Sequence, residues 1–370
     1  MGDCHTGRQW QPHRGHARPS TATGIRAIRH PDWQGQRVTS VYCLELAGEA
    51  DDEAFAALEA ERAASASALS RVAPGLATAR GVRLGRVPTL AYTHRVSELV
   101  GRTDASIASA VAVLQAASIE RTGSVAVRAR NVRSTAEVST ASAERELGGV
   151  LVERDFTVDL DDPDHELRVC FADDVCLVGW LVAERNAAFG SRAPTDRPFF
   201  QPGSMAPMDA RAYVNLAAGP ALPDATVLDP MCGTGGLLIE AGLAGARAIG
   251  SDAQWKMARG AAENLDHYLP DADWDVVRGD ATELPVADDA ADAVVFDAPY
   301  GRQSKIAGHE LADLVGGALA EAARVAPACV LVADRSWVDV ARDAGWEVEA
   351  RFERRVHRSL VRHVHVLRRA

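Results

Sequence analysis

The first half of the chain alternates between short runs with a period of two residues and longer runs with a helical period. The short runs predict strands, and the longer ones predict amphipathic helices. In SVYCLELAGE (40–49), Tyr42, Leu44 and Leu46 fall on one face of a predicted strand, and DDEAFAALEAERAASASAL (51–69) predicts the helix that follows. We therefore expect a small α+β unit at this point.

A second α+β unit is predicted around SVAVRAR (124–130), where the residue type differs between the two faces of a strand. Val125 and Val127 fall on one face, and Arg128 and Arg130 fall on the other. We interpret the first face as core and the second as cationic. Arginines on a solvent-facing strand usually serve solubility, and RNA binding is the sharper alternative for Arg128 and Arg130.

The second half of the chain has a different rhythm, in which strands and helices alternate. This order is typical of a doubly wound α/β fold with a parallel sheet. The last segment, WEVEARFERRVHRSLVRHVHVLRR (346–369), instead alternates at period two around a central break, which predicts an antiparallel hairpin that closes the sheet. The five predicted parallel strands are 225–229, 246–252, 274–280, 292–297 and 328–334.

These patterns divide the chain of 370 residues into five parts. Residues 1–38 are rich in Arg, His, Gly and Pro and lack any period, so we interpret them as a disordered or artefactual extension. We then expect an α+β domain at 39–98, a second α+β domain at 99–186, a Gly- and Pro-punctuated linker at 187–208, and the α/β domain at 209–370.

Composition and charge narrow the class of protein. No apolar run reaches the roughly 18 residues of a membrane helix, so we expect no membrane contact and a cytoplasmic location. The formal charge of −11 argues at first against a nucleic-acid partner, although its distribution matters more than its sum. The six cysteines form no C-x-x-C pair, so we expect reduced core thiols and no metal site; we expect the C-terminal His357, His363 and His365 at the surface or at strand edges.

A glycine-rich turn follows the first strand of the predicted parallel sheet. In VLDPMCGTGG, Asp229 closes the strand, and Gly233 and Gly235 lead into a helix. Glycines allow a ligand to approach the backbone closely, and the helix start offers free N–H donors. A tight turn without a ligand is the alternative. The segment is not a P-loop, because no Gly-Lys-Ser/Thr follows.

Four consecutive predicted strands of this sheet end in an aspartate, namely Asp229, Asp252, Asp280 and Asp297. The carboxyl ends of parallel strands form the edge at which such sheets bind ligands. Asp252 is placed to accept both hydroxyls of a ribose, and Asp280 to accept a hydrogen bond from an adenine amino group. NAD is not favoured, because the spacing G-x-G-x-x-G is absent.

The motif DAPYG (297–301) resembles the Asp/Asn-Pro-Pro-Tyr signature of class I S-adenosylmethionine-dependent methyltransferases that modify exocyclic amino groups. The resemblance implies a Rossmann-like sheet, S-adenosylmethionine as cofactor, and catalytic roles for Asp297, Pro299 and Tyr300. Ala298 replaces the usual first proline; because its side chain is not the part that reacts, we expect the chemistry to be kept and the loop to be less rigid.

The upstream segment RPFFQPGSMAPMDARAYVNLAA (197–218) resembles the one that precedes the cofactor strand in archaeal and eukaryotic tRNA guanine-10 N2-methyltransferases. This resemblance places Phe200, Pro202 and Ser204 beside the methionine end of the cofactor. The two α+β units are similar to the ferredoxin-like and THUMP RNA-binding domains of that family. Arg302, directly after the motif, is a further candidate for RNA contact.

The resemblance therefore predicts methyl transfer to N2 of a guanosine in tRNA, with nucleotide 10 as the expected target. An enzyme for another tRNA position or for ribosomal RNA remains an alternative, and so does a non-catalytic RNA-binding factor. A DNA amino-methyltransferase is disfavoured, because the sequence contains no long insertion that could read the groove of a DNA duplex. Eukaryotic relatives need an activator protein, and the sequence leaves open whether this chain does.

Overall fold

The structure is a computed structural model that describes residues 40–186, 188–300, 310–358 and 360–370. These residues form two compact units, one ending at residue 187 and the other beginning at Ala188. In the described part of the chain, no helix has both the length and the apolar character needed to cross a membrane.

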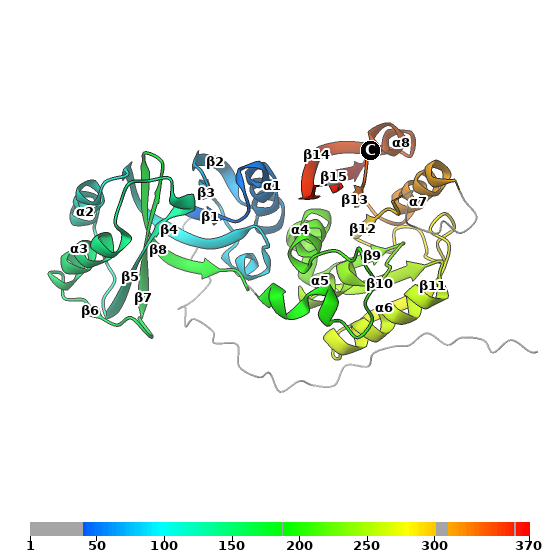
Figure 1. The fold of residues 1–370 in the computed structure, drawn as a ribbon, viewed down its shortest axis with the longest axis horizontal. Helices are drawn as coiled ribbons and strands as arrows, with labels where there is room; N and C mark the ends of the chain where they lie inside the picture. The colour runs from blue at the N-terminus through cyan, green and yellow to red at the C-terminus, as the bar shows by residue number, and fades with distance from the viewer. Residues whose placement is uncertain (1–39, 187, 301–309, 359) are drawn as a thin grey trace, which may run out of the picture. The chain divides into compact units, whose positions relative to one another are not determined.

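The first unit is built on one eight-stranded sheet in the order β2-β3-β1-β4-β8-β7-β5-β6, seen in blue to green in Figure 1. Helices α2 and α3 cover the core formed with β5, β7 and β8. The strands are β1 (Val41–Leu46), β2 (Ser67–Ala73), β3 (Leu76–Arg80), β4 (Thr93–Asp104), β5 (Ser124–Asn131), β6 (Thr157–Val158), β7 (His165–Ala172) and β8 (Val175–Glu184). The helices are α1 (Glu53–Ala64), α2 (Ile107–Ala116) and α3 (Thr140–Val152).

The helix predicted over residues 51–69 is too long. Helix α1 ends at Ala64, because Ser65 adopts a left-handed conformation with φ of 53°. Residues from Ser67 onward instead form β2, which pairs with β3 as a hairpin at the sheet edge. The small Ala and Ser residues that suggested a continued helix are compatible with both structures, and strand pairing decides between them.

The two α+β units predicted from the sequence share this single sheet. Strand β4 runs through the expected boundary at residue 98 and pairs with β1 on one side and β8 on the other. A buried ion pair also joins them, since Arg168 donates to both carboxylate oxygens of Glu45, at 2.9 and 3.0 Å. Both side chains are at most 8% exposed.

The second unit contains a seven-stranded sheet in the order β11-β10-β9-β12-β13-β15-β14. The first five strands are parallel, and β15 runs antiparallel to β13, so the predicted C-terminal hairpin is confirmed. The strands are β9 (Thr226–Asp229), β10 (Arg247–Asp252), β11 (Trp274–Arg278), β12 (Ala293–Asp297), β13 (Ala328–Ala333), β14 (Trp346–His357) and β15 (Leu360–Arg369).

Helices cover both faces of the parallel sheet (Figure 1). Helices α4, α5 and α6 pack side by side on one face, and α7 and α8 lie on the other. Val294 and Phe296 of β12 pack against α7, as expected for alternate residues of a strand buried on both faces. The helices are α4 (Pro207–Ala218), α5 (Gly236–Leu243), α6 (Trp255–Tyr268), α7 (Leu311–Val325) and α8 (Val338–Asp343).

The expectation that His365 lies at the surface or at a strand edge is wrong. Its side chain is fully buried. Nε2 accepts a hydrogen bond from the Trp337 backbone N–H at 3.0 Å, and Nδ1 lies 3.2 Å from the Leu331 carbonyl oxygen. Burial lowers the pKa of His365 to about 4, so the ring is neutral near pH 7. The prediction of core thiols is confirmed for the described cysteines, all of which are buried and free.

Candidate active site

The candidate site lies where the strand order of the parallel sheet reverses. Strand β9 pairs with β10 on one side and β12 on the other; the chain runs outward from β9 through β10 to β11 and then crosses back to β12. Asp229, Asp252 and Asp297 end these three adjacent strands. Burial raises the pKa of Asp229 well above its usual value, and the charges of Asp252 and Asp297 raise it further. The three carboxyl groups therefore lie close together at one edge.

Asp252 orders the glycine-rich turn that precedes α5. One carboxylate oxygen accepts the Gly233 N–H at 3.0 Å, and the other accepts the Gln254 N–H at 2.8 Å. Gly233 and Gly235 have φ of 53° and 75°, in the left-handed region that favours glycine. The turn thus exposes backbone beside a carboxylate that still has lone pairs for a ligand.

Gly235 is expected not to tolerate a side chain. A Cβ added there would lie 2.7 Å from Leu265 Cδ1, in a backbone conformation that is already strained for other residues. For Gly235→Ala we expect a loss of roughly 1–2 kcal/mol from the left-handed conformation and a further ~1–3 kcal/mol from the overlap. Thermal unfolding and calorimetric titration with S-adenosylmethionine measure the loss of stability and of affinity.

A matched control for this substitution is Gly316→Ala in α7. The added Cβ would meet Val340 Cγ1 at an ordinary contact distance of 3.6 Å. Because alanine is also the better helix former, we expect unchanged or slightly higher stability. A Gly235→Ala protein as stable and as tightly bound to cofactor as this control would contradict the assignment of the turn.

The segment that precedes α4 is attached to this turn by a residue that the sequence did not single out. Asn264 of α6 is fully buried, accepts the Phe199 N–H at 2.8 Å, and donates to the carbonyl oxygens of Phe199 and Thr234 at 2.8 and 2.9 Å. The hydroxyl oxygens of Ser204 and Thr234 are 3.2 Å apart. The sequence did contain a signal for Asn264, because it is a polar residue on the buried face of an amphipathic helix.

The other two residues predicted in this segment are more exposed. The Phe200 side chain is 42% exposed, and Pro202 is exposed as well. Arg197, in contrast, is 5% exposed and donates to the Thr234 hydroxyl at 3.3 Å and the Met205 carbonyl at 3.4 Å. Hydrogen bonds with Arg197 and Asn264 therefore fix the segment, in which Phe200 and Pro202 are exposed and Met205 is buried.

The motif DAPY follows β12 and forms a connected polar group with the C-terminal hairpin. The Tyr300 hydroxyl donates to Asp297 Oδ1 at 2.9 Å, and Arg362 Nε donates to the Tyr300 oxygen at 3.2 Å. Burial raises the pKa of Asp297 to about 6, against the opposing charge of Arg362 and the bond from Tyr300. Burial also raises the pKa of Tyr300, so its hydroxyl keeps its proton.

Arg362 also belongs to a group of charged side chains that includes Asp209 and Arg354. Its side chain is 4% exposed, and its guanidinium lies 3.5 Å from Asp209 of α4. Arg354 of β14 donates to the other Asp209 oxygen at 2.8 Å. Sequence reasoning missed Arg362, Asp209 and Arg354, since strand alternation gives no indication of which hairpin arginines turn toward the motif.

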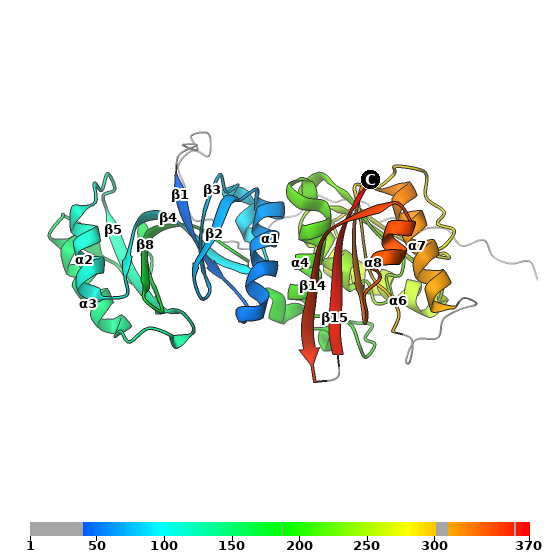
Figure 2. The ribbon, with the colours of Figure 1, turned by 90° about the horizontal axis from the view of Figure 1, so that it is seen from above.

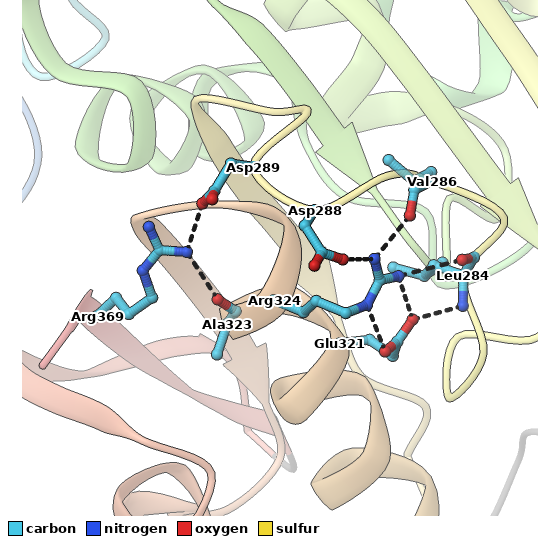
Figure 3. A network of polar contacts seen from close by, with 8 residues as sticks. All are labelled: Leu284, Val286, Asp288, Asp289, Glu321, Ala323, Arg324 and Arg369. Atoms are coloured by element: carbon cyan, nitrogen blue, oxygen red, sulfur yellow. Dashed lines mark hydrogen bonds and ion pairs between the residues drawn. The ribbon is translucent and has the colours of Figure 1, made fainter.

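Asp280 lies two residues beyond the end of β11, rather than at its last residue as predicted, and forms an isolated bridge with Glu283. Its Oδ1 accepts the Thr282 N–H and hydroxyl at 2.9 and 2.8 Å. The loop that follows is fixed to α7, because Arg324 donates to Leu284, Val286 and Asp288 (Figure 3).

The predicted RNA-contacting arginines have protein partners where they are described. Arg128 donates to the Leu160 carbonyl at 2.5 Å, and Arg130 lies 3.2 Å from the buried Glu45 carboxylate. The face of β5 that carries them is therefore not a purely cationic surface, and their role in RNA binding stays a prediction. Arg302 lies outside the described residues.

The second unit is a class I S-adenosylmethionine-dependent methyltransferase domain. Three features define it: the strand order, the reversal of that order at β9, and the acidic strand ends with the DAPY loop. A family model described as RMKL-like, methyltransferase domain, matches residues 194–364, and a THUMP domain model matches residues 105–180.

Curated relatives extend this result to most of the chain. The tRNA (guanine(10)-N2)-dimethyltransferase of Methanothermobacter thermautotrophicus is 36% identical over 290 residues, 76% of this chain and 83% of that protein. The proteins of the same name from Methanocaldococcus jannaschii and Pyrococcus abyssi are 32% and 33% identical, over 70% and 66% of this chain and 74% of each relative. The chain belongs to the tRNA (guanine(10)-N2)-dimethyltransferase family, which confirms the resemblance inferred from its motifs.

Proposed function

We propose that this protein transfers methyl groups from S-adenosylmethionine to the exocyclic N2 of guanosine 10 in tRNA. The observation that carries the proposal is the hydrogen-bonded group of Asp297, Tyr300 and the buried Arg362 at the carboxyl end of β12. Membership of the family supplies the substrate, because its named members act on guanosine 10 of tRNA. These relatives are named dimethyltransferases, which also supports the transfer of two methyl groups in succession to the same nitrogen.

The residues at the carboxyl edge fit S-adenosylmethionine in their chemistry. Asp252 has carboxylate oxygens that would accept both ribose hydroxyls, and Asp280 would accept from the adenine amino group. Gly233 and Gly235 would leave the backbone open to the cofactor, and Phe200, Pro202 and Ser204 would lie by its methionine end. When bound, the cofactor supplies an electrophilic methyl group.

The protein's own groups prepare the amine to react. The nitrogen lone pair of a guanine amine is delocalised into the ring, which makes it a poor nucleophile. Asp297 and the carbonyl of Ala298 or Pro299 would accept its two N–H bonds, which favours a tetrahedral nitrogen and aims its lone pair. The Ala298 N–H donates to the Val332 carbonyl at 2.8 Å, so the loop that carries these acceptors is fixed to β13.

Asp297 needs to be ionised for this role but need not be a strong base. With a pKa of about 6 it is mostly a carboxylate at neutral pH and accepts hydrogen bonds. The amine becomes acidic as it gains the methyl group, so its proton leaves readily. Tyr300 would stack on the base once the nucleotide has left its helix or loop. Orientation and electrostatics therefore account for most of the expected rate enhancement.

The experiment that tests the proposed function is transfer from labelled S-adenosylmethionine to an unmodified tRNA transcript, with nucleoside analysis of the product. We expect N2-methylguanosine or N2,N2-dimethylguanosine, and we expect neither when position 10 carries adenosine. Methylated guanosine that survives this change would move the site to another nucleotide. A complete lack of transfer would favour a partner-dependent enzyme or an RNA-binding factor.

A further inference from the structure

The C-terminal hairpin extends past the edge of the sheet at which the candidate active site lies. Pairing between β13 and β15 runs from Ala328 with Arg368 to Ala333 with His363, where β13 ends. Residues 360–362 of β15, and the part of β14 that pairs with them, therefore continue beyond the last residue of β13. Figure 2 shows these two strands as a long paired ribbon.

This extension lies beyond the carboxyl end of β12 as well. Strands β12 and β13 are parallel, with Asp297 opposite Val332, so both end at the same edge. Arg354 pairs with Arg362 across the hairpin, and both side chains reach Asp209. Because a strand rises ~3.3 Å per residue, the connection begins roughly 7 Å beyond Arg362, which itself contacts Tyr300.

The extension is strongly basic in an otherwise acidic chain. Residues 354–362, RRVHRSLVR, contain four arginines and no acidic residue, whereas the whole chain has a formal charge of −11. Arg354 and Arg362 share the single carboxylate of Asp209, and Arg362 also interacts with the charge of Asp297. Arg355 and Arg358 are exposed, and within the described residues neither forms an ion pair.

We call Arg355, Val356 and Arg358 the hairpin tip. The Val356 side chain between the two arginines is 44% exposed. Two uncompensated guanidinium groups that flank an exposed apolar side chain match the chemistry of a nucleic-acid strand. Guanidinium groups bind phosphates in a bidentate manner, and a small apolar side chain packs against a sugar or base.

We propose that the hairpin tip binds the sugar-phosphate backbone of the RNA on one side of the nucleotide whose base enters the site at Asp297 and Tyr300. This inference rests on the proposed function. A base that leaves its stack must be accompanied by its own backbone, which then lies at the rim of the pocket. The hairpin tip supplies cations at that rim, where the three aspartates of the strand ends would otherwise repel phosphate.

The test is the double variant Arg355→Gln and Arg358→Gln in the full-length protein. We expect roughly a tenfold or larger increase in the tRNA Kd, measured by fluorescence anisotropy, and a similar increase in KM for tRNA with kcat nearly unchanged. Because each phosphate contact on a single strand contributes about 0.7 to the slope of log Kd against log salt, the slope should fall by about 1.4. Affinity for S-adenosylmethionine should not change.

The matched control removes two arginines from the opposite edge of the same sheet. Arg247 begins β10, and Arg342 lies near the end of α8; both form only exposed ion pairs. We expect the variant Arg247→Gln and Arg342→Gln to bind tRNA like the wild type. Equal tRNA affinity and salt slope in the two double variants would overturn the proposal. So would loss of binding to an acidic polypeptide with tRNA binding retained, since the hairpin tip would then be a protein-docking site.

This result is separable from a failure of the proposed function. A wild-type protein that forms no methylguanosine at position 10 would contradict the proposed function. The anisotropy measurement does not depend on methyl transfer, and it still decides whether the hairpin tip binds RNA. Thermal unfolding of both double variants checks that these exposed substitutions leave the fold intact.

Discussion

Replacing Asp297 with alanine is expected to lower kcat by roughly a hundredfold to ten-thousandfold while the Kd for tRNA stays unchanged. The change removes the acceptor that we propose for one N–H of the target amine, and it leaves the RNA-binding surfaces intact. Single-turnover methyl transfer and tRNA anisotropy measure the two quantities. A variant with wild-type activity would remove the proposed role of Asp297.

Asp334→Asn is the matched control for this substitution. Asp334 lies just beyond the end of β13, and its negative charge raises the pKa of Asp297. Its removal should leave activity near the wild-type level at pH 7 and move the acidic limb of the pH profile slightly downward. A loss as large as that of Asp297→Ala would show that general disturbance of this edge, rather than the loss of one acceptor, lowers activity.

Removing the charge of Asp297 should raise the stability of the protein while it lowers the activity. A pKa raised from 3.8 to about 6 means that the folded protein binds the Asp297 proton more tightly than the unfolded chain does. Stability from this group is therefore present at low pH and is lost as the pH rises through 6, by at most about 3 kcal/mol. Asp297→Asn should raise the melting temperature at pH 7 while activity is lost, which is typical of a residue retained for function.

Replacing Arg362 with methionine is expected to lower activity at pH 7 by roughly tenfold or more and to make it recover partly at higher pH. Arg362 donates to the Tyr300 hydroxyl, and its charge opposes the rise in the pKa of Asp297. Without that charge the pKa of Asp297 rises further, so a larger fraction of the carboxyl is protonated at neutral pH. The acidic limb of the kcat profile should therefore move to higher pH.

The charged and titratable groups around Asp297 determine how this shift is interpreted. Arg362 and Tyr300 lower its pKa, Asp334 raises it, and Asp229 faces it from β9. Arg354→Met is the matched control, because Arg354 shares Asp209 with Arg362 but makes no described contact with Tyr300. An unshifted acidic limb in Arg362→Met, or an equal shift in Arg354→Met, would contradict the assignment. Arg362→Lys keeps the charge and should restore most of the profile.

Features that are marked by residues close together along the chain could be predicted from the sequence. Asp229, Asp252 and Asp297 are strand ends that directly follow apolar runs, and the glycine-rich turn is marked by its own residues, so both appear in the structure as expected. The hairpin was predicted from its alternation at period two. These features depend on neighbours along the chain, which one sequence displays fully.

Features that depend on distant residues were not predicted. Arg362 reaches Tyr300 across 62 positions of the chain, and Asn264 reaches Phe199 across 65. His365 is buried because Trp337 and Leu331 meet it from other elements. Arg130, expected on a cationic face, faces Glu45 across 85 positions. Periodicity assigns such residues to a face but gives no information about what the fold places opposite them.

The most direct test of whether the exocyclic N2 of guanosine 10 is the methylated atom compares two tRNAs that differ only in this amine. One carries guanosine at position 10 and the other carries inosine, which lacks the exocyclic N2 group but keeps the rest of the base. We expect methylation of the first tRNA, none at position 10 of the second, and comparable binding of both. Methyl transfer to inosine 10 would place the reaction on another atom and would contradict the roles assigned to Asp297 and Tyr300.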